Sequence, residues 1–315
     1  MENKVLFIDT THPLLPQMLE EAGFVCEHFY GRGKQELLDV VASYKGLIVR
    51  SGIRIDKEII DKAVSLKFIG RVGAGTENID TVYAEKKGVA CFKAPEGNRD
   101  AVAEHALGML LALNNKLIVA DTQVRQGIWK REENRGTEIN GKTLGIIGFG
   151  NMGSAFAKRL SGFGLKVLAY DKYKSGFGND LVKESTMEEL FESCDIVSLH
   201  LPLTAETEFL VNDDWLAKFK KPFVLINTAR GKIVKTASLV QALKEGKLTG
   251  ACLDVLEYEK SSFEELYKKE LPEDFRYLVA SSKVVFSPHI AGWTHESNRK
   301  LAEVTARKII DFCRR

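Results

Sequence analysis

Three segments in the second half of the chain carry residues that could move a proton and bind an anion. His289 lies in FSPHIAG, Arg230 in INTARGKIV and Glu259 in LEYEK. Oxidation of a secondary alcohol by hydride transfer needs a base for the hydroxyl proton, and the reverse reaction needs an acid. Histidine serves both because its ordinary pKa lies near neutral pH. His289 is therefore the candidate acid–base residue.

A carboxylate can hold such an imidazole in place and stabilise its charged form, and a guanidinium can bind a substrate carboxylate. Glu259 is the candidate partner of His289, although Glu257 is a rival. Arg230 can pair with a carboxylate through two parallel hydrogen bonds and polarise the oxygen on the reacting carbon. Each residue also has a structural alternative: an ion pair for Arg230, a loop histidine for His289 and a solvated carboxylate for Glu259. The remaining histidines are interpreted as structural or surface residues: His12, His28, His105, His200 and His295.

The segment GFGNMG at 148–153 fits the pattern G-x-G-x-x-G of dinucleotide-binding turns. It follows the apolar run TLGII and opens the run AFAKRL, which is the strand–turn–helix context that the motif requires. Gly148 permits the tight turn, Gly150 lets a pyrophosphate approach the backbone, and Gly153 lets helix and strand pack closely. The start of the helix offers N–H groups to the phosphates. The alternative is a glycine-rich turn in an unrelated α/β protein.

The next expected strand ends in Asp171, 18 residues after Gly153. A carboxylate there accepts hydrogen bonds from the adenosine ribose hydroxyls and repels a 2′-phosphate. The position therefore favours NAD over NADP, although Lys172 and Lys174 nearby weaken that preference.

Short apolar runs rich in β-branched residues alternate with amphipathic stretches, which is the pattern of βαβ units around a parallel sheet. The first series predicts strands at 5–8, 46–49, 68–72 and 89–92, a short strand near Val25, and helices at 14–22, 34–42, 56–63 and 80–87. The second predicts strands at 144–147, 167–170, 196–199, 224–226, 251–254 and 284–286, and helices at 151–163, 187–192 and 237–245. Between them we expect one long apolar helix at 99–127, which must be buried against the other domain or a second subunit, and we favour the second subunit.

These elements predict an α/β protein with two doubly wound parallel-sheet domains. A Rossmann NAD-binding domain at 99–289 is expected to be inserted in a flavodoxin-like substrate domain formed by 1–98 and 290–315, because the final helix at 296–314 should return to the first domain. The polar stretch 257–283 is predicted to be a surface insertion with one short helix.

Composition excludes several classes of protein. The 315 residues carry a net charge of +2, which argues against a nucleic-acid footprint, and no apolar run is long enough for a membrane span. The start, MENKVLFIDT, leads directly into a strand pattern, so no signal peptide is expected. Five scattered cysteines show no metal-ligand or paired spacing and suit a reducing compartment, which predicts a cytoplasmic protein without a metal: Cys26, Cys91, Cys194, Cys252 and Cys313.

Several ordered motifs make the chain resemble the D-2-hydroxyacid dehydrogenase family over nearly its whole length. They are GRVGAGTENID, APEGN followed by AEHALGMLLAL, GKTLGIIGFGNMG, CDIVSLHLPLT, and the three segments described first. The resemblance implies NAD as cofactor and places the family's catalytic residues on Arg230, Glu259 and His289. It further implies that the cofactor is lined by Asn151, Met152, Asp171, Leu201, Pro202, Thr228 and Asp254, the last near the nicotinamide carboxamide. The backbone of Gly73, Ala74 and Gly75 is expected to bind the substrate carboxylate.

Three arginines of the first domain bear on the substrate. Arg50 and Arg71 each follow a strand and Arg54 lies one short turn further on, so these guanidiniums could hold a second anion such as a phosphate. GRVGAGTENID resembles the version of this loop in family members that oxidise 3-phosphoglycerate to 3-phosphohydroxypyruvate for serine biosynthesis. The resemblance thus implies a small phosphorylated 2-hydroxy acid, and we expect a homodimer. Alternatively, Arg54 pairs with a surface acid such as Asp56.

Departures from the family pattern bear on the substrate more than on the reaction. Lys260 stands where the family usually has proline, the stretch from Glu259 to His289 is longer than usual, and Trp293 is bulky where many relatives carry a small residue. No regulatory domain is expected after Arg315. The alternative functions are a broad reductase of glyoxylate or hydroxypyruvate and, less favoured because all three catalytic positions are present, a non-catalytic NAD-sensing protein that resembles the family's corepressors.

Overall fold

The computed structural model describes residues 3–259 and 272–314, which form two compact units. Within the described residues, the first unit consists of 3–98 and 293–314 and the second of 99–259 and 272–292. Lys260 and much of the insertion predicted at 257–283 lie outside the described residues. The described end of that stretch forms the helix α11 (Glu273–Ala280).

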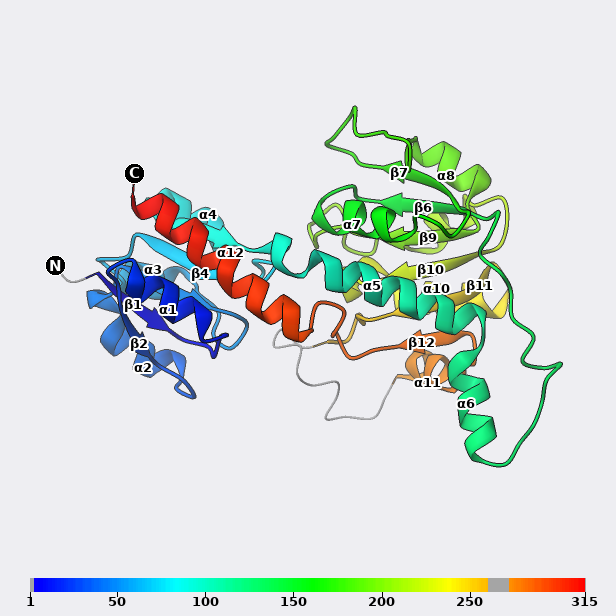
Figure 1. Cartoon of the computed structure of the whole chain (residues 1–315), viewed down its shortest axis with the longest axis horizontal. Coiled ribbons are helices and arrows are strands. Elements are labelled where there is room, and N and C mark those ends of the chain that lie inside the picture. The colour runs from blue at the N-terminus through cyan, green and yellow to red at the C-terminus, as the bar shows by residue number, and fades with distance from the viewer. Residues whose placement is uncertain (1–2, 260–271, 315) are drawn as a thin grey trace. The chain divides into compact units, whose positions relative to one another are not determined.

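The first unit is built on a five-stranded sheet whose strands all pair in parallel (Figure 1). Its strands are β1 (Lys4–Phe7), β2 (Val25–His28), β3 (Gly46–Val49), β4 (Phe68–Arg71) and β5 (Ala90–Lys93). The order β2-β1-β3-β4-β5 is that of flavodoxin-like folds, and its topological switch point lies between β1 and β3. Each predicted strand is confirmed to within two residues.

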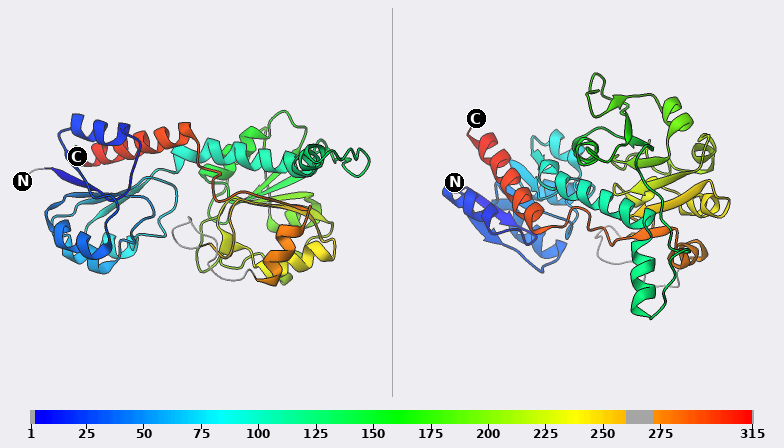
Figure 2. Two further views of the ribbon diagram at one scale, coloured as in Figure 1. Left: turned by 90° about the horizontal axis from the view of Figure 1, so that it is seen from below. Right: turned by 45° about the vertical axis from the view of Figure 1, so that its right-hand side comes forward.

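Helices cover both faces of this sheet, which explains why its strands are apolar at nearly every position. Val5 and Phe7 of β1 pack with α1 (Leu14–Glu21) and α12 (His295–Cys313), which Figure 2 shows on one face. Leu6 and Ile8 point to the opposite face because strand side chains alternate. That face is covered by α2 (Lys34–Val40), α3 (Lys57–Lys62) and α4 (Thr81–Lys86).

The second unit contains a seven-stranded sheet, again with every pairing parallel. Its strands are β6 (Thr143–Ile147), β7 (Lys166–Tyr170), β8 (Lys183–Glu184), β9 (Ile196–Leu199), β10 (Phe223–Asn227), β11 (Leu248–Leu253) and β12 (Val284–Phe286). The order β12-β11-β10-β9-β6-β7-β8 contains the Rossmann arrangement, with the switch point between β6 and β9. The short edge strand β8 is absent from the sequence-based prediction.

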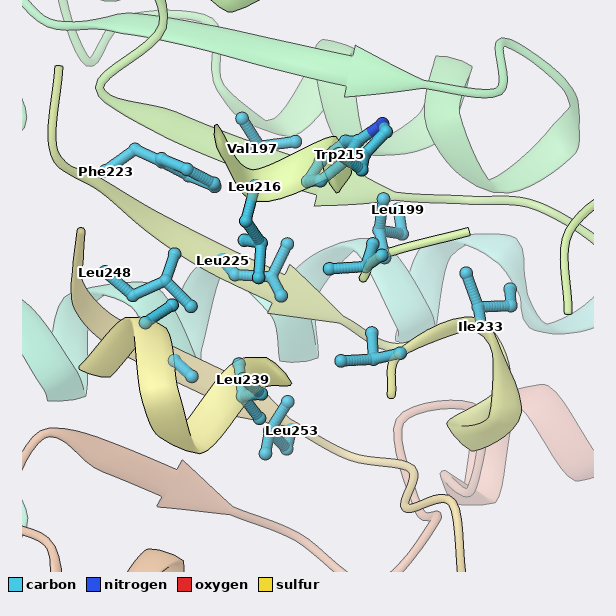
Figure 3. Packing of buried hydrophobic residues seen from close by; sticks show 14 of the residues in the cluster. Val197, Leu199, Trp215, Leu216, Phe223, Leu225, Ile233, Leu239, Leu248 and Leu253 are labelled. Carbon is cyan, nitrogen blue, oxygen red and sulfur yellow. The ribbon is translucent and has the colours of Figure 1, made fainter. Parts of the chain in front are cut away.

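Two layers of helices bury the faces of this sheet. One core contains residues of α5 (Pro95–Asn114) and α7 (Asn151–Arg159), such as Leu110 and Phe156. The other, drawn in Figure 3, joins Val197 and Leu225 of the sheet to Trp215 and Leu239 of the covering helices. Those helices are α8 (Met187–Ser193), α9 (Asp213–Ala217), α10 (Thr236–Lys244) and α11.

The single helix predicted at 99–127 is wrong, because the structure has two helices there. α5 ends at Asn114 and α6 (Leu117–Arg125) begins after Lys116, whose φ of 52° lies in the left-handed region. A left-handed residue ends a helix, and an apolar pattern that continues on both sides of it does not reveal the break. Three apolar side chains of α6 are more than half exposed: Leu117, Ile118 and Val124.

Candidate active site

The turn between β6 and α7 shows why its glycines are needed. Gly148 has a φ of +93°, and a Cβ there would lie 2.4 Å from the carbonyl oxygen of His200, which follows β9. A Cβ on Gly153 would lie 2.1 Å from the oxygen of Gly148. In contrast, a Cβ on Gly150 would meet nothing within 4 Å. The fold itself thus requires two of the glycines, whereas the third leaves open space beside the helix start.

Several groups around this space suit a dinucleotide. α7 begins after Gly150 with no side-chain cap and no acidic residue in its first turn, so Asn151, Met152 and Gly153 present backbone N–H groups suited to phosphates. Leu201 lies at the same turn, since its Cδ2 is 3.0 Å from the Cβ position of Gly148. The hydroxyl of Thr228, after β10, is buried without a hydrogen-bond partner among the described residues. The residues present therefore fit bound NAD.

Asp171, directly after β7, is attached to the same turn. Its Oδ2 accepts the backbone N–H of Phe149 at 2.8 Å, and its Oδ1 accepts that of Tyr173 at 3.0 Å. Each carboxylate oxygen has a second lone pair that could accept a ribose hydroxyl. The carboxylate is thus held where the sequence predicts contact with the ribose.

The two lysines beside Asp171 are engaged by other groups. Nζ of Lys172 lies 2.8 Å from Oε2 of Glu206, which also accepts the Tyr173 hydroxyl at 2.7 Å. The hydrogen bond to Glu206 raises the pKa of Lys172 above its ordinary value. Lys174 donates to the carbonyl oxygen of Phe149 at 3.2 Å. Sequence reasoning identified the lysines but missed Glu206, which lies 34 positions further along the chain.

His289 and Glu259 form a side-chain pair. Nδ1 of His289 lies 2.7 Å from Oε2 of Glu259, and the side chains are 23% and 12% exposed. Because a carboxylate only accepts, Nδ1 carries the hydrogen and Nε2 is the ring nitrogen left for acid–base chemistry. The other oxygen of Glu259 accepts the backbone N–H of Leu256. The rival Glu257 instead accepts the N–H of Thr236 at 2.8 Å, at the start of α10.

The backbone of His289 is unusual, and Asp254 holds it. His289 has a φ of +57°, a conformation that costs a non-glycine residue roughly 1–2 kcal/mol. Asp254, 1% exposed, accepts the N–H groups of Ile290 and Ala291, each at 2.9 Å, and its carbonyl accepts that of His289 at 2.7 Å. Contact of Asp254 with the nicotinamide carboxamide stays a prediction. Its hydrogen bonds to this loop are a feature that sequence reasoning missed.

Arg230 lies in a turn after β10 that packs directly against the Glu259 loop. The Asn227 side chain accepts the N–H of Ala229 at 3.1 Å and donates to the carbonyl of Arg230 at 3.0 Å, which shapes the turn. A Cβ on Gly231 would lie 1.9 Å from the oxygen of Leu256. β10 and β12 are separated only by β11, so their carboxyl ends are about 10 Å apart. The Arg230, Glu259 and His289 segments thus meet at one edge of the sheet.

In the first unit, Arg71 and the glycine-containing loop after β4 are packed together. Arg71 ends β4, and its Nη1 donates to the carbonyl of Val72 at 2.9 Å. The same nitrogen would lie 1.4 Å from a Cβ on Gly73. Gly73 must therefore lack a side chain for the guanidinium to take this position, next to the predicted carboxylate-binding residues Ala74 and Gly75.

Arg50, Arg54 and Trp293 also belong to the first unit. Arg50 follows β3, and its guanidinium carbon is 4.4 Å from the ring centroid of Trp293, a side chain that is 67% exposed. Arg54 is exposed and forms no ion pair within residues 3–259 and 272–314. The alternative that it pairs with Asp56 is wrong, because Asp56 caps α3 and lies 2.6 Å from Nζ of Lys34.

Residues 3–259 and 272–314 contain no group of three or more His, Cys, Asp or Glu side chains that could hold a metal ion. They also contain no helix with the length and apolar character of a membrane span.

A doubly wound sheet with a glycine turn, an uncapped helix start and a carboxylate after the next strand defines a dinucleotide-binding α/β protein. Residues 107–291 match the model of the D-isomer specific 2-hydroxyacid dehydrogenase NAD-binding domain. This match spans more than half of the chain, so the protein belongs to the D-isomer specific 2-hydroxyacid dehydrogenase family. The NAD and family predictions are confirmed.

Individual relatives differ in their substrates. The chain is 34% identical to D-3-phosphoglycerate dehydrogenase of Sus scrofa over 314 residues, 98% of this chain but only 56% of that protein. It is 39% identical to glyoxylate reductase of Thermofilum pendens over 284 residues, covering 88% of this chain and 80% of that protein. The structure of D-lactate dehydrogenase from Aquifex aeolicus with NAD and lactic acid aligns with a TM-score of 0.82 and 29% identity, covering 98% and 95% of the two chains. The chain thus spans little more than half the length of the phosphoglycerate dehydrogenases that it matches.

Proposed function

We propose that the protein is an NAD-dependent dehydrogenase of a small 2-hydroxy acid. The observation that carries this proposal is the His289–Glu259 pair, at 2.7 Å, at the sheet edge that also bears the Arg230 turn. Family membership supports it as well.

The proposed chemistry assigns one task to each residue. NAD, when bound, accepts the hydride from the hydroxyl-bearing carbon, and the products are a 2-oxo acid, NADH and a proton. Nε2 of His289 accepts the hydroxyl proton while Nδ1 donates to Glu259, whose negative charge stabilises the imidazolium. Arg230 binds the substrate carboxylate.

We favour 3-phosphoglycerate as the substrate, oxidised to 3-phosphohydroxypyruvate in serine biosynthesis. The phosphoglycerate dehydrogenase relatives support this choice over 98% of the chain. Arg50 follows β3, Arg54 lies further along the same loop and Arg71 ends β4, and we assign the phosphate to these guanidiniums. The competing substrates are glyoxylate and hydroxypyruvate, and the 39% identity to a glyoxylate reductase supports them.

Steady-state kinetics with NADH separate these substrates. We expect kcat/KM for phosphohydroxypyruvate to exceed those for hydroxypyruvate and glyoxylate by at least about tenfold, because an additional ion-paired anion contributes on the order of 1.5–3 kcal/mol. Faster turnover of glyoxylate or hydroxypyruvate would reject the phosphorylated substrate and leave the reaction class intact. Binding of NADH without turnover of any 2-oxo acid would favour the NAD-sensing alternative.

We also propose a homodimer that covers α6. Leu117, Ile118, Val124 and Trp129 are 52–78% exposed on this helix and the loop after it, and such a patch is typical of an interface. Ile118→Asp should produce a monomer in sedimentation velocity, whereas Val82→Asp, at a somewhat more exposed position on α4, should not. A monomeric wild-type protein would contradict the dimer. The cytoplasmic location stays a prediction.

A further inference from the structure

A network of three hydrogen-bonded side chains connects α5 to the loop that carries His289. Nε2 of His105, on α5, lies 2.7 Å from Oγ of Ser287, and Ser287 Oγ lies 2.6 Å from Oδ1 of Asp254. The same Oδ1 accepts the backbone N–H of Ile290 at 2.9 Å. The network therefore connects a helix surface to the residues on both sides of His289 through continuous hydrogen bonds.

The direction of these hydrogen bonds follows from the number of protons available. The Ser287 hydroxyl has one proton, and a carboxylate only accepts, so Oδ1 of Asp254 at 2.6 Å takes that proton in preference to the sulfur of Met109 at 3.6 Å. The contact with His105 then requires the hydrogen to be on Nε2 of the imidazole. His105 thus donates to Ser287, which donates to Asp254. Hydrogen bonds aligned in this way polarise and strengthen one another.

We propose that His105 is a positioning residue for the acid–base loop and acts through Ser287 and Asp254. The inference rests on the proposed role of His289 as the acid–base residue. Within residues 3–259 and 272–314, His105 makes no hydrogen bond or ion pair with His289 or Glu259. Its Nε2 also lies 3.6 Å from Oδ1 of Asp254, which is longer than either hydrogen bond through Ser287. The N–H of His105 instead holds the Ser287 side chain in the rotamer that donates to Asp254. Asp254 in turn holds the left-handed backbone at position 289 through its hydrogen bonds to this loop. Without the donor, Ser287 can rotate and the loop can relax from that conformation.

Two substitutions of His105 separate the donor from the space that it fills. His105→Leu places a side chain of similar size on α5 but removes the donor, and kcat should fall by about tenfold to a hundredfold, the cost of misplacing a catalytic group by up to 1 Å. The KM for the 2-oxo acid and the Kd for NADH should stay within about twofold. His105→Gln carries an amide N–H and should recover most of the lost kcat. Glu104→Gln, on the same helix but paired with Arg159, is the matched control and should have no effect.

A double-mutant cycle tests whether the effect passes through Ser287. Ser287→Ala removes the intermediate hydroxyl, so adding His105→Leu to it should lower kcat no further, whereas independent residues give multiplied losses. Multiplied losses would overturn the proposal. An unchanged kcat in His105→Leu would also overturn it, as would equal losses in the Leu and Gln variants accompanied by equal falls in thermal stability.

Amide hydrogen exchange provides a readout that does not depend on turnover. In His105→Leu the segment 287–291 should exchange about tenfold faster than in the wild type, and the Gln variant and the Glu104→Gln control should match the wild type. Unchanged exchange in this segment would reject the positioning role. If the wild type turns over no 2-oxo acid but the exchange changes as expected, the proposed function fails and the positioning of the loop stands.

Discussion

Nδ1 of His289 lies 2.7 Å from Oε2 of Glu259, although 30 positions separate the two residues in the chain. Glu257, only two positions from Glu259, contacts the start of α10 instead. The two carboxylates therefore have different tasks, and each provides a control for the other.

Glu259→Gln should lower kcat on the order of a hundredfold, because the amide still accepts a hydrogen bond but no longer stabilises an imidazolium. Glu257→Gln should leave kcat unchanged and reduce the free energy of unfolding by about 1 kcal/mol, since it weakens a helix-start contact. Steady-state kinetics and urea unfolding of both variants test this assignment. Equal kinetic losses in the two variants would contradict it.

The glycines of the dinucleotide turn should respond differently to alanine. A Cβ on Gly150 meets no protein atom within 4 Å, so Gly150→Ala should keep the melting temperature within about 2 °C but weaken NADH binding by tenfold or more, because the methyl group enters the space predicted for the pyrophosphate. Gly153→Ala brings a Cβ to 2.1 Å from the Gly148 oxygen and should lower the melting temperature as well. Fluorescence titration with NADH and calorimetry measure the two effects. NADH affinity unchanged in Gly150→Ala would show that the pyrophosphate binds elsewhere.

Glu206 should contribute to the preference for NAD. Its carboxylate holds Lys172 at 2.8 Å, so Glu206→Gln releases an ammonium close to Asp171 that can approach a 2′-phosphate. We expect kcat/KM with NADPH to rise severalfold relative to NADH, and no more, because exposed ion pairs are weak and Asp171 still repels the phosphate. The double variant Glu206→Gln/Lys172→Ala should lose this gain. An equal NADPH preference in both variants would exclude Lys172 as the cause.

His200 should make stability depend on pH. Burial lowers the pKa of His200 to about 4 in the folded protein, against an ordinary value of 6.5. Between these pH values the unfolded chain binds a proton that the folded protein does not. The contribution of neutral His200 to the free energy of unfolding is therefore fully present above pH 6.5 and is lost as the pH falls toward 4. His200→Gln should remove up to about 3 kcal/mol of this dependence. Urea unfolding at pH 7 and pH 4.5, without NAD, compares the two proteins. An equal loss of unfolding free energy between the two pH values in both proteins would refute the prediction.

The repeating elements could be predicted because their causes are local. Buried parallel strands are continuous apolar runs, so all but β8 were predicted from sequence, and the glycine turn was recognisable because it lies between such a strand and a helix. The break between α5 and α6 was missed because the left-handed conformation of Lys116 leaves no trace in an apolar pattern.

By itself the sequence determined the two parallel sheets, the dinucleotide turn and the residue types of the proposed acid–base and anion-binding groups. Only the tertiary structure decided that Glu259 rather than Glu257 contacts His289, that Glu206 engages Lys172, and that Asp254, Ser287 and His105 connect the loop to α5. The physical reason is the sequence separation over which each kind of interaction acts. Side-chain periodicity and turn chemistry act over a few neighbouring residues, whereas these hydrogen bonds join segments far apart in the chain that strand pairing and helix packing bring together.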